Sequence, residues 1–264
     1  TETHKLEVHV AGTVTVDATS RIDVSGKGYL VGRTTGNTAA GASTGGGGSY
    51  GGLGRSNGGS VNAVYGDYTD PDDWGSGGSS SGGVGGGLVR ILANSIVLDG
   101  QLLADGGHGG SGGGIYLAVG VLRGSGLLRA GGGTSDYGLA PGGGGRVAVY
   151  AGDYSGFTLA NITAAGGTGG VSGGAGTVYL RDTTQPQGVL VIDGSSGGGG
   201  WTPLGVAGTN WYGFGDSVVI RGSGAHVMPE HAGLVLEFSG GLTVTSGATL
   251  HVGDISFSGG GMLD

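Results

Sequence analysis

The sequence predicts an all-β protein, a right-handed parallel β-helix (solenoid) with ordered glycine-rich loops that can adopt polyproline-II-like strands. Three observations support this prediction. Glycine accounts for 72 of the 264 residues, strand-like segments alternate with the glycine runs, and these segments recur at similar spacings. Helices are disfavoured because no window of ten or more residues shows a 3.6-residue apolar period free of glycine and β-branched residues.

The glycine content indicates close backbone packing rather than collagen or a disordered linker. Collagen needs glycine at every third position, and runs such as residues 45–48 and 142–145 lack that period. Disordered segments contain few branched apolar residues, whereas residues 88–92 and 177–180 are typical strand sequences. Glycine is favoured where stacked segments leave no room for a Cβ atom. The alternative of flexible linkers is weakened because the runs keep register with the strands.

A short strand with the pattern apolar–variable–apolar recurs through the middle of the chain. It starts at Val89, Ile115, Val147 and Val178, at spacings of 26, 32 and 31 residues. Alternation with a period of two places the apolar members on one face. Stacked repeats would therefore form an inner apolar column from these residues and a second from Ile91, Leu117, Val149 and Leu180. The variable members would form an outward column of Arg90, Tyr116, Ala148 and Tyr179.

A second strand with the pattern apolar-x-Ala-x-Gly follows in step with the first. It occurs at residues 102–106, 128–132 and 162–166, and a related phrase occupies residues 22–26. One such unit cannot bury its own apolar face, whereas stacked units bury it against their neighbours, as in a solenoid. An all-β sandwich is the alternative, because antiparallel strands can also recur at regular intervals.

The chain divides into three parts of one continuous structure. Residues 1–84 are expected to form irregular β and glycine-rich coils, and residues 85–182 the regular glycine-rich repeats. Residues 183–264 are expected to form plainer β-helix coils, because short alternating strands dominate there.

Charge and composition exclude several classes of protein. Nineteen acidic residues against 11 basic ones give a net charge of −8, and an acidic surface disfavours nucleic acid as a partner. No run of 18 apolar residues is present, so no membrane span is expected. The chain lacks cysteine, which suits exposure to oxidants outside the cell. It starts at Thr1 without a leader, as expected for a processed secreted protein or a piece of a longer chain.

Several phrases resemble the glycine-rich repeats of very large secreted bacterial surface proteins. They lie at residues 13–17, 21–26, 112–117, 144–150 and 174–180. That family is described as β-helical or adhesin-like, so the resemblance implies an extracellular, cell-surface location. The resemblance covers about residues 12–182 and carries no catalytic motif to this chain.

A cluster of carboxylates is the candidate metal site. Asp67, Asp70, Asp72 and Asp73 lie within seven residues of each other, and alternating oxygen donors on a loop can bind Ca²⁺. Their spacing matches neither an EF-hand loop nor the nonapeptide repeat of calcium β-rolls. The alternative is that these aspartates are turn residues. No other cofactor is expected.

Aromatic residues in the loops are candidates for glycan or interface contact. Trp74, Trp201, Trp211 and Tyr212 lie in or beside glycine-rich segments, and rings with a polar group are common at binding surfaces. The alternative is that they anchor loops to the wall of the solenoid.

These features predict a non-catalytic structural or adhesive extracellular domain, part of a large surface protein or of a self-assembling fibre. The partners expected are flanking domains of the same polypeptide, identical subunits stacked end to end, or cell-surface glycans. A β-helix enzyme acting on polysaccharides is one alternative, disfavoured because no acidic residue shares the outward column with Arg90 and Tyr116. A receptor-binding adhesin tip of the phage tail-fibre type is the other.

Overall fold

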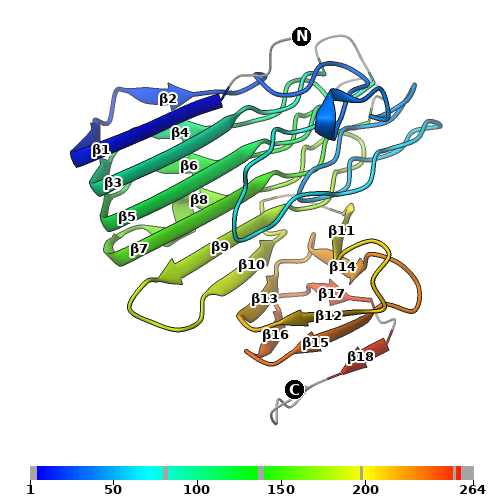
Figure 1. Ribbon diagram of the computed structural model, residues 1–264. Helices are drawn as coiled ribbons and strands as arrows, with labels where there is room; N and C mark the ends of the chain where they lie inside the picture. Colours follow the sequence, from blue (N-terminus) through cyan, green and yellow to red (C-terminus); the bar gives the residue numbers. More distant parts are fainter. Residues whose placement is uncertain (1–4, 80–82, 136–139, 197–198, 252–253, 257–264) are drawn as a thin grey trace.

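The computed structural model describes residues 5–79, 83–135, 140–196, 199–251 and 254–256. Within these residues the regular secondary structure is almost entirely β-strand, and the helical elements are the short 3₁₀ turns Thr35–Asn37 and Leu159–Asn161. The strands form one eight-stranded sheet, one four-stranded sheet and two three-stranded sheets (Figure 1).

Long and short strands alternate through the first two thirds of the chain. The long strands are β1 (Lys5–Val16), β3 (Leu88–Leu98), β5 (Gly114–Gly124), β7 (Arg146–Phe157) and β9 (Thr177–Asp182). They pair in parallel and in that order. The short strands are β2 (Arg21–Asp23), β4 (Gln101–Leu103), β6 (Leu127–Arg129) and β8 (Ile162–Thr163). They form the four-stranded parallel sheet, which lies behind the long strands in Figure 1.

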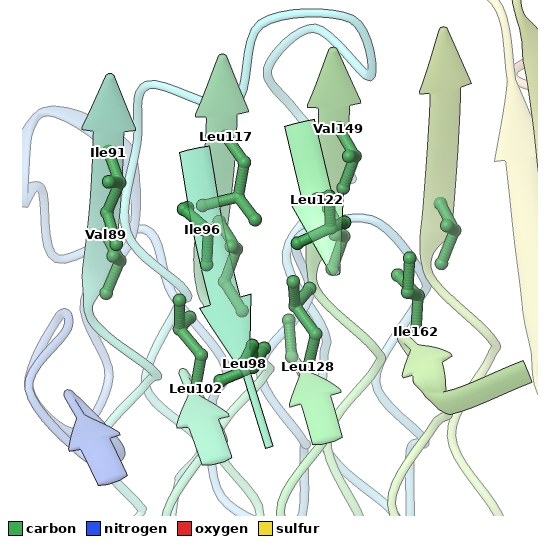
Figure 2. Packing of buried hydrophobic residues seen from close by; sticks show 14 of the residues in the cluster. Val89, Ile91, Ile96, Leu98, Leu102, Leu117, Leu122, Leu128, Val149 and Ile162 are labelled. Carbon is green, nitrogen blue, oxygen red and sulfur yellow. The ribbon is translucent and has the colours of Figure 1, made fainter. Parts of the chain in front are cut away.

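The register of the repeats predicted from the sequence is confirmed. Val89 pairs with Ile115, Ile115 with Val147, and Val147 with Val178. The second strand motif is aligned in the same way. Its first apolar residues are paired in sequence across the short strands: Ile22, Leu102, Leu128 and Ile162. Figure 2 shows apolar side chains of the long and short strands gathered between the two layers. Their burial excludes water from the space between the sheets, which is the main stabilising term of such a core.

The prediction of a single right-handed parallel β-helix is wrong. The eight-stranded sheet is mixed, because β10 (Val189–Asp193) runs antiparallel to β9, with Leu190 opposite Tyr179. The reversal starts at Asp182, whose carboxylate accepts hydrogen bonds from the Thr184 amide and hydroxyl at 2.8 and 2.6 Å. Its carbonyl accepts from the Gln185 amide at 3.0 Å, which closes the turn. A β-helix would have continued in parallel pairing at this point.

The strands after the reversal are shared among three sheets. β10, β13 (Ser217–Arg221) and β16 (Leu242–Thr245) complete the large sheet. β11 (Trp201–Leu204), β14 (His226–Pro229) and β17 (Thr249–Leu250) form one small parallel sheet. β12 (Trp211–Phe214), β15 (Val235–Phe238) and β18 (Asp254–Ser256) form the other. A second buried cluster, which includes Phe214, Val227 and Phe238, lies among these sheets.

The glycine-rich segments are hydrogen-bonded and closely packed rather than free. They gather on the side of the molecule from which β3, β5 and β7 start (Figure 1). The amide of Gly143 donates to the Gly48 carbonyl at 2.9 Å, and that of Gly144 donates to the Gly174 carbonyl at 2.9 Å. A Cβ atom built on Gly144 would lie 2.0 Å from the Ala164 carbonyl oxygen. Such close approach between backbones explains the requirement for glycine.

The expected outward column is covered by a second layer of chain. Residues 65–74 cross the outer face of the large sheet, where the Tyr150 hydroxyl donates to the Thr69 carbonyl at 2.9 Å. Arg90 donates to Asp70 at 2.7 Å and stacks 4.1 Å above the ring of Tyr116. Tyr179 is only 1% exposed. The sequence interpretation of this face as solvent-facing is therefore corrected.

Candidate ligand-binding pocket

The loop of residues 65–74 that crosses the large sheet is called the covering loop below. A pocket of about 400 Å³ opens where this loop meets the strands that follow the β9–β10 turn. Gly66, Asp67 and Tyr68 line it from the covering loop, and Arg146 lines it from the first position of β7. The opposite wall comes from the end of β11 and from β12, and it consists of Pro203, Leu204, Gly205, Val206, Tyr212 and Phe214. We call this the aromatic pocket. Its size is in the range of small-ligand sites, about 300–1,000 Å³.

Three aromatic rings line the aromatic pocket, Tyr68 from the covering loop and Tyr212 and Phe214 from β12. Tyr212 and Phe214 alternate with Gly213 along β12 and so share a face. Their ring centroids are 4.9 Å apart in an edge-to-face arrangement. Tyr68 stacks near Phe214 at 6.1 Å, and Phe214 in turn stacks on its cross-strand partner Phe238 at 5.0 Å. Such contacts hold the rings at fixed positions.

One hydrogen bond and one further ring contact position Tyr68. Its hydroxyl donates to Asp216 at 3.4 Å, and its ring meets Tyr179 edge-on at 5.5 Å. Asp216 also accepts from the Tyr179 hydroxyl at 3.2 Å and from the Gly188 amide at 2.7 Å. Burial raises the pKa values of Tyr68 and Tyr212 above their usual range, so both phenols stay protonated at neutral pH.

Arg146 is the cation of the aromatic pocket and is only 7% exposed. Its Nε donates to the Tyr65 carbonyl at 2.9 Å and one Nη to the Thr177 hydroxyl at 3.2 Å. The guanidinium carbon lies 5.4 Å from the centre of the Tyr50 ring. Burial lowers the pKa of Arg146 from its usual value, although arginine stays charged near neutrality.

Asp67 lies at the exposed side of the aromatic pocket. One carboxylate oxygen accepts hydrogen bonds from the amide and hydroxyl of Thr69 at 2.8 and 2.9 Å. Within the described residues, no carboxylate makes an ion pair with Arg146. Asp67 therefore acts on the buried guanidinium only through space.

The four aspartates predicted to bind calcium are not brought together. Asp70 pairs with Arg90. Asp73 accepts hydrogen bonds from the Tyr29 hydroxyl, the Trp74 amide and the Thr35 hydroxyl, at 2.7, 2.8 and 2.7 Å. In the part of the chain that the structure describes, neither Asp67, Asp70, Asp72 and Asp73 nor any other acidic, histidine or cysteine residues form a group of three or more able to hold a metal.

The predicted aromatic residues occupy four different environments. Trp74 packs edge-on against Tyr29 at 5.8 Å. Trp201 packs against both His226 and His251, at 5.6 and 4.5 Å, and borders a separate depression. Trp211 is 56% exposed and donates from Nε1 to Glu237 at 3.0 Å. Tyr212 alone of these four lines the aromatic pocket, together with Asp67 from the predicted metal cluster.

Sequence reasoning missed Arg146 and Phe214 as parts of a site. Arg146 pairs with Gly114 and Thr177, and Gly114 pairs with Leu88, so Arg146 is a charged residue among buried neighbours. The other charged member of this row, Lys5 at the edge strand, is exposed. The exception at Arg146 was a usable signal. The sequence contained no such signal for Phe214, because its position beside Tyr68 depends on the change of strand direction after β9.

The comparisons with known proteins found no matching family model, no matching curated protein and no matching solved structure. Among the described residues, none of the helices is long and apolar enough to span a membrane.

Proposed function

We propose that this chain is a non-catalytic adhesive domain of an extracellular surface protein, and that the aromatic pocket binds a saccharide. The observation that supports this proposal is the combination of three packed aromatic rings with a carboxylate and a guanidinium in one pocket. A sugar ring has apolar C–H faces and polar hydroxyl edges. The pocket offers matching surfaces, because its rings are apolar on their faces and its charged groups hydrogen-bond.

The rigidity of the aromatic pocket favours binding. Its aromatic residues are held by ring contacts, Tyr68 also by a hydrogen bond to Asp216, and Arg146 is held at two of its nitrogen atoms. A site fixed before its ligand arrives loses little conformational entropy on binding.

The lining also favours binding over hydrolysis. Glycoside hydrolysis normally requires two carboxyl groups, about 5–9.5 Å apart. Among the described residues that line the aromatic pocket, Asp67 is the one carboxylate. We therefore do not propose the alternative of a polysaccharide-active enzyme.

The proposal is tested by titrating the protein with a panel of neutral and acidic oligosaccharides by calorimetry. We expect Tyr212→Ala to weaken binding about 10–30-fold, because truncating a central aromatic contact commonly costs about 2 kcal/mol. Trp211→Ala is the matched control: it is the adjacent aromatic residue, but it does not line the pocket. Absence of binding to every oligosaccharide, or equal losses in both variants, would overturn the proposal.

We also propose that the partners of the domain include flanking domains or identical copies. β1 and β16 are the two edges of the eight-stranded sheet within the described residues, and unpaired strand edges favour pairing with further chain. Light scattering over a range of concentrations measures self-association directly.

A further inference from the structure

The charge balance of the aromatic pocket is unusual at Arg146. Its side chain is buried, yet its hydrogen-bond partners among the described residues are a carbonyl and a hydroxyl, both neutral. The other buried or half-buried arginine that contacts this face, Arg90, has Asp70 as a counter-ion. Burying a charge is costly unless it is paired and hydrogen-bonded. Arg146 is therefore a buried cation that forms no ion pair with a carboxylate of the described residues.

Arg146 also retains free hydrogen-bonding capacity. A guanidinium carries five N–H donors, and two of them are used by Tyr65 and Thr177. The remaining donors find no acceptor among the described residues, and the side chain lines the pocket. An incoming acceptor can therefore reach them without displacing a protein group.

The surroundings hold Arg146 in place. Its guanidinium lies over the Tyr50 ring, and a Cβ atom built on Gly66 would lie 3.0 Å from that same ring. The Tyr50 hydroxyl is buried without a hydrogen-bond partner in the described residues. The cation–π contact offsets part of the burial cost, and the hydrogen bonds to Tyr65 and Thr177 orient the guanidinium.

We infer that the aromatic pocket selects an acidic sugar, with the sugar carboxylate bound by Arg146. A carboxylate suits the guanidinium because the two can form parallel, charge-assisted hydrogen bonds. Asp67 at the exposed side would accept hydrogen bonds from sugar hydroxyls and would repel a second negative group. One buried cation opposed by one exposed anion thus favours a singly charged residue such as a uronic acid.

This inference depends on the proposed saccharide binding and makes it more specific. It is tested by calorimetry with trimers of galacturonic, glucuronic and mannuronic acid, each compared with its carboxyl-reduced neutral counterpart. We expect at least one acidic trimer to bind the wild-type protein tenfold or more tightly than its neutral counterpart. Sulfated neutral trimers form a third arm, because a sulfate presents a single negative charge with different geometry.

Two variants test whether the preference for the acidic trimer arises in the aromatic pocket. Arg146→Gln keeps an amide donor for the Tyr65 carbonyl but removes the charge, and is expected to abolish the preference for the acidic trimer. Asp67→Asn removes the exposed negative charge and is expected to raise affinity for the acidic trimer about threefold, with little change for the neutral one. Circular dichroism checks folding. If Arg146→Gln is misfolded, the ratio of acidic to neutral trimer affinity, measured on the wild type and on Asp67→Asn, still tests the inference.

The outcomes separate the inference from the proposed function. Equal affinities for acidic and neutral trimers would overturn the inference and leave saccharide binding intact. Tighter binding of sulfated than of carboxylated trimers would overturn the assignment of the carboxylate. Absence of binding to every trimer would overturn both.

Discussion

Gly143 lies where glycine-rich segments pack backbone against backbone, so replacing it with alanine measures how much such contacts contribute to stability. An added Cβ atom would lie 1.9 Å from the Gly52 carbonyl oxygen and 2.5 Å from its carbon. The two segments would have to separate by at least about 1 Å to relieve this overlap. The separation would also strain the hydrogen bond from the Gly143 amide to Gly48. Overpacking costs about 1–3 kcal/mol and a lost hydrogen bond about 1 kcal/mol, so we expect a loss of about 2–4 kcal/mol.

Thermal unfolding followed by circular dichroism provides the assay. For a chain of this size such a loss lowers Tm by roughly 4–16 °C. Gly170→Ala is the matched control, because a Cβ atom there would meet nothing within 4 Å. This control should be neutral or slightly stabilising, since alanine restricts the unfolded chain. Equal Tm values for the two variants would refute the steric argument and show that the glycine runs contribute little to packing.

Three further predictions concern the core, pH and metals. Ile115→Asp places a charge at a fully buried position between Val89 and Val147, and should cost several kcal/mol; an unchanged Tm would contradict the register. Hydrogen bonds from Ser155, with Arg123 adding to them, lower the pKa of Asp153 from 3.8 to about 2. Asp153→Asn should therefore lower Tm above pH 4, and the difference should vanish as the pH falls toward 2; a constant difference would contradict this. Because Asp70 and Asp73 are bonded to protein groups, Ca²⁺ and EDTA should leave Tm unchanged, and a rise of several degrees with Ca²⁺ would show that the aspartates bind it.

The sequence predicted the apolar columns because they rest on local information. Val89, Ile115 and Val147 each follow a glycine run and alternate with variable residues, and a period of two fixes the face on which they lie. Spacing between repeats then fixed their partners. The strand content and near-absence of helix followed from the same alternation.

The reversal after β9 could not be derived from that information. Residues that alternate in polarity fit a strand of either direction, so the pattern at Val189 does not distinguish parallel from antiparallel pairing. The turn signal lay in residues 182–187, where Asp182 and Pro186 favour a reversal. When the alternating pattern continues on both sides of a turn, it does not show whether the strand direction has changed.

The aromatic pocket was only partly predictable for a related reason. Tyr212 and Asp67 were recognised as candidates by residue type. Their meeting depends on the covering loop and on the reversal, which bring together residues 66–68, 146, 203–206, 212 and 214. The aspartates of residues 67–73 were a candidate calcium site because the sequence does not show that Arg90 binds Asp70 and that Tyr29 binds Asp73.

The central claim is that the aromatic pocket binds a saccharide, and an experimental structure of the protein with an acidic trimer bound tests it most directly. The account predicts a sugar ring against Tyr212, its carboxylate within hydrogen-bond distance of the Arg146 guanidinium, and hydroxyl groups near Asp67. A trimer bound at saturation elsewhere on the surface, with the aromatic pocket unoccupied, would contradict it.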